Sequence, residues 1–303
     1  MKLVPGLISV IMSNYNTPEE YLREAIESIL NQTYKNFEFI IIDDCSTDNS
    51  LEIIKSYNDE RIVLIENEEN IGLTKSINKG LAVAKGEYIA RMDADDVSLP
   101  QRFEKQINYM NDHTELIVCG SSMELIGSWE GKFLNKIVYR TLPEREVFRI
   151  FLLFGNHTNI PNNVAMFRHE KLLSNNVKYN ENYIYAQDYR MWVECSKYGE
   201  CYNLEDVLVL YRIHDGAVSS AKKQAQKECA KNIMAEQLSW LDLKLPDNWE
   251  ELHYGFFIGR KKYNLATKAW LKKIIEKNKK YKIYNQKKLE KLLWEKWAET
   301  TYF

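Results

Sequence analysis

Three carboxylates lie within four residues of this chain, Asp93-Ala94-Asp95-Asp96, directly after the apolar run 88–92. Carboxylates this close repel one another at neutral pH, and a hard divalent cation with oxygen ligands compensates that repulsion. Such a cation also binds phosphate oxygens. The alternative is an ordinary acidic loop between a strand and a helix, which these four residues alone do not exclude. Features elsewhere in the sequence are needed to distinguish a metal–phosphate site from a solvated turn.

Apolar runs and amphipathic segments alternate through the first hundred residues. The predicted strands are 7–12, 37–42, 61–65 and 88–92, and the predicted helices between them are 17–30, 51–57 and 74–84. This alternation predicts parallel βαβ units with right-handed crossovers. Polar loops follow three of the strands, at 13–16, 43–44 and 93–96. We expect these loops to lie side by side at the carboxyl edge of the sheet, where ligands bind in open α/β folds.

The rest of the chain is less regular. A helix is expected around 103–110, followed by a strand at 116–119, strands at 164–167 and 207–211, and a helix at 189–196 between those two. This middle region is expected to complete the sheet and one wall of a cleft. From Ser219 onward the pattern is mainly helical, which predicts a helical C-terminal extension.

The C-terminal region is basic and aromatic. Between Arg260 and Lys296 there are fourteen Lys and Arg but three Glu, together with several Trp and Tyr residues. A basic amphipathic segment suits an anionic membrane surface, so one expectation is peripheral membrane contact through 260–297. The alternatives are a helix packed on the domain with a solvated lysine face, and aromatic residues that pair two subunits into a homo-oligomer.

Composition excludes several classes of protein. The balance of 41 Lys and Arg against 43 Asp and Glu gives no reason to expect nucleic acid as a partner. The five cysteines are scattered without a Cys-x-x-Cys pair, which argues against zinc or redox chemistry. No apolar stretch approaches the roughly 18 residues of a membrane span, and no secretory signal is recognised. We expect a cytoplasmic protein, with the inner face of the plasma membrane as its peripheral location.

Five segments, taken in order and spacing, resemble family 2 glycosyltransferases. They are Val10-Ile11-Met12-Ser13-Asn14-Tyr15-Asn16, Ser28-Ile29-Leu30-Asn31-Gln32-Thr33-Tyr34, Phe37-Glu38 with Ile42-Asp43-Asp44-Cys45-Ser46-Thr47-Asp48, Asn70-Ile71-Gly72-Leu73, and Gly86 to Asp96. The resemblance covers roughly the first 110 residues, with weaker similarity to about residue 220. It implies a GT-A fold, which is Rossmann-like with a mostly parallel sheet. It also implies a nucleotide-diphosphate-sugar donor, a divalent cation and inversion at the anomeric carbon.

The resemblance implies roles for residues that would bind the donor. Asp44 matches the position whose carboxylate accepts the imide hydrogen of uracil, which favours a UDP-sugar. Tyr15 is suited to stack on that base, because aromatic faces suit nucleobases. Asn70 belongs to the same donor-binding set. Asp43 is expected to be structural and to cap the following turn.

The resemblance also implies a metal site for Mn2+ or Mg2+. Asp93 and Asp95 are assigned together to the donor and the metal, with Asp93 on the donor side, and the part played by Asp96 stays open. In Tyr211-Arg212-Ile213-His214-Asp215-Gly216, His214 matches the family histidine that reaches the metal or the diphosphate. A metal here would stabilise the charge that develops on the leaving phosphate.

Inverting transfer needs one base for the acceptor hydroxyl. Asp188 in Gln187-Asp188-Tyr189-Arg190-Met191-Trp192 matches the family base, although the usual Glu before it is Gln187 here. The alternative role for Asp188 is a helix N-cap. Asn162-Asn163 also departs from the family, where this stretch often begins His-Pro, so no acceptor preference is borrowed.

The sequence therefore predicts a GT-A domain at 1–218, with a nucleotide-sugar half at about 1–120 and an acceptor half at 121–218, and a helical extension at 219–303. The expected activity is metal-dependent transfer from a UDP-sugar to a saccharide or lipid-linked saccharide in surface polysaccharide synthesis, of the capsule or lipopolysaccharide type. Two alternatives are a haloacid-dehalogenase-like phosphatase, with Asp93 as nucleophile, and an inactive sugar-nucleotide-binding scaffold. The phosphatase reading gives no role to Asp44 or Asp188.

Overall fold

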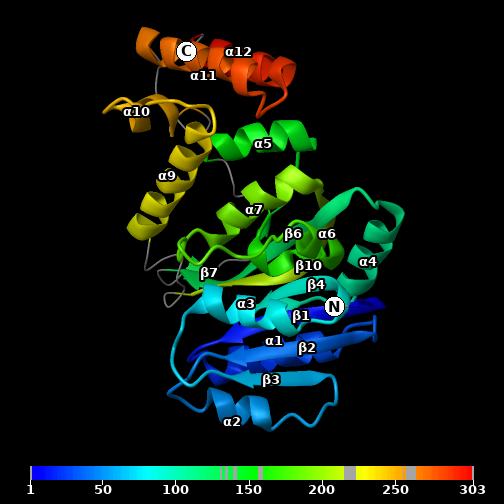
Figure 1. The fold of residues 1–303 in the computed structure, drawn as a ribbon. Coiled ribbons are helices and arrows are strands. Elements are labelled where there is room, and N and C mark those ends of the chain that lie inside the picture. The colour runs from blue at the N-terminus through cyan, green and yellow to red at the C-terminus, as the bar shows by residue number, and fades with distance from the viewer. Residues whose placement is uncertain are drawn as a thin grey trace. The chain divides into compact units, whose positions relative to one another are not determined.

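A computed structural model describes residues 2–129, 132–133, 136–138, 142–155, 160–214, 223–254, 256 and 264–301. The chain divides into two units. Unit 1 comprises residues 1–142 and 159–221, and unit 2 comprises 143–158 and 222–303 (Figure 1). The domain boundary expected near residue 218 falls in 215–222, outside the described residues.

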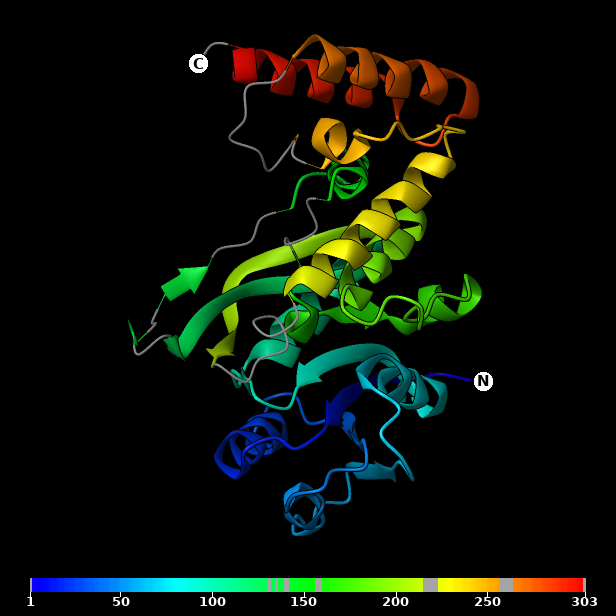
Figure 2. The ribbon, with the colours of Figure 1, turned by 90° about the vertical axis from the view of Figure 1, so that its left-hand side faces the viewer.

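Unit 1 is built on one mixed sheet. Its strands are β1 (Val4–Asn14), β2 (Phe37–Asp43), β3 (Ile62–Glu66), β4 (Gly86–Asp93), β5 (Val97–Ser98), β6 (Leu116–Trp129), β7 (Lys132–Phe133), β8 (Lys136–Val138), β9 (Met166–Arg168) and β10 (Glu200–Ile213). Their order is β3-β2-β1-β4-β9-β6-β10-β5, with β7 and β8 beside β6. Strands β1 to β4 are parallel, whereas β9 runs antiparallel between β4 and β6. The long strands β6 and β10 pair in parallel and curve together (Figure 2).

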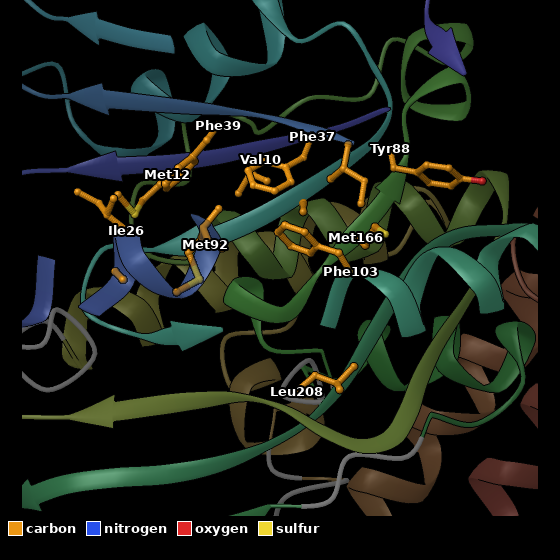
Figure 3. Packing of buried hydrophobic residues seen from close by; sticks show 14 of the residues in the cluster. Val10, Met12, Ile26, Phe37, Phe39, Tyr88, Met92, Phe103, Met166 and Leu208 are labelled. Atoms are coloured by element: carbon orange, nitrogen blue, oxygen red, sulfur yellow. The ribbon is translucent and has the colours of Figure 1, made fainter. Parts of the chain in front are cut away.

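Helices cover both faces of the first four strands. Unit 1 contains α1 (Glu19–Leu30), α2 (Ser50–Lys55), α3 (Leu73–Val83), α4 (Arg102–Asp112), the 3-10 turn η1 (Asn162–Val164), α6 (His169–Ser174) and α7 (Gln187–Tyr198). One face of β1, β2 and β4 packs against α1 and α4, where Val10, Phe39, Met92, Ile26 and Phe103 form part of a single buried cluster (Figure 3). Side chains at every second strand position enter this cluster, as the two-residue strand period requires.

On the opposite face of the sheet, α3 packs unusually close to β1 and β2. A Cβ atom placed on Gly80 would lie 2.8 Å from Cγ2 of Ile11 and 3.0 Å from Cδ1 of Ile42. Distances this short leave no room for a side chain, so the glycine allows α3 to rest directly on β1 and β2. The helix is consequently a fixed part of the sheet layer.

Unit 2 is helical. It contains α5 (Arg145–Leu153), α9 (Lys223–Ser239), α10 (Trp249–His253), α11 (Leu265–Tyr281) and α12 (Gln286–Thr301), and Figure 2 shows α11 and α12 lying side by side. Trp270, Leu271 and Ile274 of α11 are buried in the same cluster as Leu289 and Leu293 of α12. The apolar faces of these helices therefore form the core of the unit itself. Among the described residues, no helix is long and apolar enough to cross a bilayer.

The expected α/β fold class with a helical C-terminal region is confirmed, with differences in the middle of the chain. The strand expected at 116–119 continues to Trp129 as β6, and the one expected at 207–211 begins at Glu200 as β10. Helix α5 was not predicted, and it belongs to unit 2 although its sequence lies inside the expected acceptor half. Its apolar residues Ile150 and Leu153 pack in a cluster with residues about a hundred positions later in the chain.

Candidate active site

The strand ends that carry polar loops meet, as the alternating pattern predicted. In the parallel register of the sheet, Asn14 of β1 stands opposite Asp43 of β2, and Ser13 stands opposite Asp93 of β4. Asn14 Nδ2 donates a 2.9 Å hydrogen bond to Asp43 Oδ1. Asp43 Oδ2 accepts the backbone N–H of Ser46 at 3.0 Å. Asp43 therefore caps the turn after β2, which confirms its structural role.

Asp96 is the anchor of the acidic turn. Its side chain is 1% exposed, and its two oxygens accept the backbone N–H of Arg212, at 2.7 Å, and the amide of Asn163. Burial, followed by repulsion from Asp95 and Asp93, raises the pKa of Asp96 well above its ordinary value. Because protein donors engage both oxygens, Asp96 fastens the turn to β10 and η1.

Asp93 forms an ion pair with a buried arginine of the same strand. Arg91 has no exposed surface, and its Nη2 lies 2.8 Å from Asp93 Oδ1. The other guanidinium nitrogen, Nη1, donates to the carbonyl of Ile11 at 2.5 Å, which ties the pair to β1. Burial raises the pKa of Asp93, Arg91 opposes that rise, and Asp95 and Asp188 add to it. About a third of the Asp93 side chain is still exposed, so its desolvation is partial.

Asp95 and His214 face each other. His214 Nε2 and Asp95 Oδ2 are 3.0 Å apart, and both side chains are partly exposed. Arg212 reinforces this pairing, because its Nε donates to the Asp95 carbonyl at 2.8 Å and its guanidinium lies 4.2 Å from the ring centre of Tyr21. The structure thus brings together the two residues predicted as metal ligands.

A carboxylate oxygen and an imidazole nitrogen at this separation suit two positions around one divalent cation. Within the described ranges, no group of three or more His, Cys, Asp and Glu side chains is arranged to hold a metal. Asp95 and His214 therefore fit a cation that completes its coordination with diphosphate oxygens and water, as Mg2+ commonly does. Residues 215–220, which follow His214 directly, lie outside the described residues.

Asp44 lies at the start of α3 and is covered. Its Oδ1 accepts from the side chain of Asn67 at 2.8 Å and from the N–H of Ile71 at 2.9 Å, and its Oδ2 accepts from the N–H of Gly72 at 2.8 Å. Asp44 is 2% exposed. In this conformation the carboxylate binds the loop that leads into α3, and protein donors engage both of its oxygens.

The other predicted donor contacts are open to solvent. Tyr15 follows β1 and is 48% exposed, and Asn70 is exposed in the loop before α3. Tyr15 follows β1, Asp44 follows β2 and Asn70 precedes α3, so all three belong to loops at the carboxyl edge of the sheet. Their exposure suits ligand contact without assigning it.

Asp188 lies in the first turn of α7 and is half-buried. The helix begins at Gln187 with Ala186 as its N-cap, so the alternative that Asp188 is the N-cap is wrong. Its Oδ1 accepts the N–H of Tyr189 at 2.7 Å. Its charge raises the pKa of Asp93, so the predicted base lies within electrostatic reach of that carboxylate.

Three residues that position the site were missed from the sequence. Arg91 was read as part of an apolar strand, Asn163 only as a departure from a family pattern, and Arg212 only as a neighbour of His214. A charged residue in the middle of an otherwise apolar strand was the available signal for Arg91, because such a residue is rarely buried without a partner. No local pattern pointed to the bonds that Asn163 and Arg212 make with Asp96.

Comparison with known proteins agrees with this arrangement. A family model described as Glycosyl transferase family 2 matches residues 9–173. An uncharacterized glycosyltransferase of Haemophilus influenzae is 35% identical over 243 residues, which cover 77% of this chain and 74% of that protein. Escherichia coli WfaP, named as a UDP-Glc:alpha-D-GlcNAc-diphosphoundecaprenol beta-1,3-glucosyltransferase, is 32% identical over 217 residues, or 71% of this chain and 81% of that one.

Solved structures share the fold at low sequence identity. S. aureus TarS 1–349 in complex with UDP-GlcNAc has a TM-score of 0.64 and 21% identity, covering 91% of this chain and 81% of that one. The mannosyltransferase PcManGT from Pyrobaculum calidifontis, in complex with GDP-Man and Mn2+, has a TM-score of 0.59 and 16% identity, covering 97% and 80%. These likenesses establish the GT-A architecture.

Proposed function

This chain belongs to glycosyl transferase family 2, and on that premise we propose that it transfers a sugar from a UDP-sugar to a hydroxyl of a saccharide or lipid-linked saccharide in surface polysaccharide synthesis. One observation carries the proposal. Asp93 lies at the carboxyl end of β4, beside the acidic turn in which Asp95 faces His214, and the charge of the half-buried Asp188 acts on Asp93. Family membership leaves no support for the phosphatase alternative.

The proposed chemistry is a single displacement with inversion. The acceptor oxygen attacks the anomeric carbon, the bond from that carbon to the β-phosphate oxygen breaks, and Asp188 takes the proton of the acceptor hydroxyl. Asp95 and His214 would hold the divalent cation, which when bound stabilises negative charge on the leaving diphosphate. Arg91 keeps Asp93 oriented towards the donor by pairing with one of its oxygens.

The relatives support the donor and acceptor classes without fixing them for this chain. The name of WfaP specifies a UDP-sugar donor and a lipid diphosphate acceptor, and a second relative is named for amylovoran biosynthesis. PcManGT, by contrast, was solved with GDP-Man. The nucleotide therefore has to be tested directly.

Calorimetric titration with UDP, with Mn2+ and again with EDTA, tests the donor half, and GDP serves as the competing nucleotide. We expect micromolar UDP binding that requires the metal. Asp188→Asn is expected to retain that binding and to lower sugar transfer by about a thousandfold or more, because the amide cannot accept the proton. UDP binding without transfer by the unaltered protein would favour the scaffold alternative, and parallel loss of binding and transfer in Asp188→Asn would contradict its role as base.

We also propose that unit 2 contacts an anionic lipid surface through its lysines. The aromatic residues that suggested lipid contact or subunit pairing lie in or against the core of the unit, with Trp270 4% exposed. The exposed face of α11 instead carries Lys272, Lys273 and Lys280. Contact of this kind is electrostatic and needs no inserted apolar face. Residues 260–263, the start of the segment predicted from the sequence, lie outside the described residues.

A further inference from the structure

The side chain of Asn78, in the middle of α3, forms two hydrogen bonds with the backbone of Tyr179. Asn78 Nδ2 donates to the Tyr179 carbonyl at 2.8 Å, and the Tyr179 N–H donates to Asn78 Oδ1 at 3.1 Å. A carboxamide that pairs with both groups of one residue reproduces the bonding between neighbouring β-strands. Nδ2 also donates to Glu181 Oε1 at 3.1 Å, at the exposed rim of this contact. The two partners are 101 residues apart in the sequence.

Both sides of this contact are firmly held. Helix α3 rests on β1 and β2 at Gly80, and Asp44 binds the loop residues Ile71 and Gly72 that lead into it. Tyr179 is 1% exposed, and its hydroxyl donates to Asn162 Oδ1 at 2.7 Å. The contact therefore joins two parts of unit 1 that are each fixed independently.

The joined parts have different tasks in the proposed reaction. Helix α3 begins directly after the loop that Asp44 binds and belongs to the donor half. Tyr179 opens the segment 179–186, which leads straight into α7 and Asp188. Within this segment the Asn182 N–H donates to Asn180 Oδ1 at 3.0 Å. Asn78 adds a long-range contact at the start of the path to Asp188.

We propose that Asn78 is a positioning residue that holds the segment carrying Asp188 in register with the donor site. The inference rests on the proposed function, in which Asp188 is the base. A base displaced by about 1 Å costs transfer up to about a hundredfold, because proton transfer and attack depend on alignment. Donor binding at the opposite end of α3 does not depend on this register. Loss of Asn78 therefore lowers kcat and leaves the KM for the donor largely unchanged.

Asn78→Ala and Asn78→Asp test the proposal in the full-length protein. Alanine removes both bonds to Tyr179, and aspartate, which has the same shape, removes the donor to the Tyr179 carbonyl. Hydrogen–deuterium exchange of residues 179–188 measures whether the contact holds this segment. Titration with UDP measures the affinity of the donor site, and initial rates measure sugar transfer. Glu181→Gln is the matched control, because it changes the exposed rim and leaves the Tyr179 bonds in place.

We expect faster exchange in 179–188, a ten- to hundredfold lower kcat and unchanged UDP affinity in both Asn78 variants, with Glu181→Gln like the unaltered protein. Unchanged exchange in both variants would overturn the contact. Faster exchange with an unchanged kcat would overturn its positioning role. If the unaltered protein binds UDP but transfers no sugar, the proposed function fails, while the exchange comparison still decides whether Asn78 holds the segment.

Discussion

The two units of the chain place their charges differently. Unit 1 is acidic, with 20 Lys and Arg against 31 Asp and Glu, and unit 2 is basic, with 21 against 12. Unit 1 nevertheless buries charged side chains almost completely, among them Asp44, Asp96, Arg91 and Arg102. In the described part of unit 2, the polar side chains without any exposure, His253 and Asn278, are neutral.

The difference indicates that unit 1 buries charges to build the candidate active site, whereas the core of unit 2 is built from apolar and neutral side chains. Burying a charge costs several kcal/mol unless partners compensate it. Unit 1 accepts that cost around the acidic turn, where burial lowers the pKa of Arg102 to about 9 while its Nη2 donates to the Arg91 carbonyl at 2.7 Å. In the described part of unit 2, Lys231 is a largely buried charged residue, at 9% exposure, and the exposed lysines of α11 are available to a surface. Substitutions at three places in the molecule test this contrast.

Asp96→Ala is expected to have the largest effect on folding. It removes the acceptor of the Arg212 N–H and of the Asn163 amide, and two buried donors without partners cost about 4 kcal/mol of unfolding free energy. Chemical denaturation followed by circular dichroism measures this loss. Asp206→Ala, which breaks an exposed ion pair with Lys105, is the control and should cost less than about 1 kcal/mol.

Asp96→Asn sharpens the same test. Its oxygen still accepts the Arg212 N–H, and its amide can donate to Asn163 Oδ1 once the Asn163 side-chain amide turns by about 180°, since that oxygen is buried without a hydrogen-bond partner in the described structure. Because burial already raises the pKa of Asp96, loss of its charge is itself cheap. Equal destabilisation by Ala and Asn would mean that the charge, and not the hydrogen bonds, fastens the turn.

The sequence predicted the half of unit 1 in which apolar strands and amphipathic helices alternate. The pattern located β1 to β4 and α1 to α3, because each of these elements shows its own periodicity. It did not predict that β9 runs antiparallel between β4 and β6, because β9 is three residues long and follows no such alternation. Periodicity reports which face is buried, but it does not identify the partner strand.

The same limit applies to the site. The acidic turn, Asp188 and His214 were recognisable as motifs, and the structure brings Asp95 and His214 together. A carboxylate that binds backbone N–H groups of a loop, such as Asp44, has the same sequence appearance as one that faces a ligand. Its state depends on donors 23 to 28 residues away, and that of Asp96 depends on Arg212, 116 residues away.

The lysines of α11 provide the next test. If the exposed charges of unit 2 bind an anionic lipid surface, their loss should weaken lipid binding without lowering the stability of the fold. Replacing Lys272, Lys273 and Lys280 by Gln is expected to lower binding to vesicles of phosphatidylcholine and phosphatidylglycerol about a hundredfold at low ionic strength. The melting temperature should not change, because their side chains are exposed. Vesicle flotation at increasing salt concentration measures the binding.

The control for this test replaces Lys2, Lys35 and Lys85, which are exposed in unit 1, by Gln. It should leave vesicle binding unchanged. Equal loss in both triple variants would show that overall charge, and not the α11 face, drives the binding. Equal binding to vesicles of phosphatidylcholine alone would contradict an electrostatic contact.

His253 gives the smallest of the three effects and tests the neutral core of unit 2. Its Nε2 lies 2.8 Å from the Leu153 carbonyl and its Nδ1 lies 3.2 Å from Nε1 of Trp270. A carbonyl only accepts and an indole N–H only donates, so these partners require the neutral ring with its proton on Nε2. Burial lowers the pKa of His253 to about 4, from an ordinary value of about 6.5.

Between pH 6.5 and 4, His253 is therefore protonated in the unfolded chain but stays neutral in the folded chain. The free energy of unfolding falls as the pH falls through this window. The loss is about 2 kcal/mol at pH 5 relative to pH 7.5. His253→Gln keeps one donor and one acceptor but has no proton to gain, so it should remove this part of the pH dependence. Tryptophan fluorescence during urea unfolding measures it, because five of the seven tryptophans belong to unit 2. An unchanged pH dependence in His253→Gln would place the acid sensitivity among the buried charges of unit 1 instead.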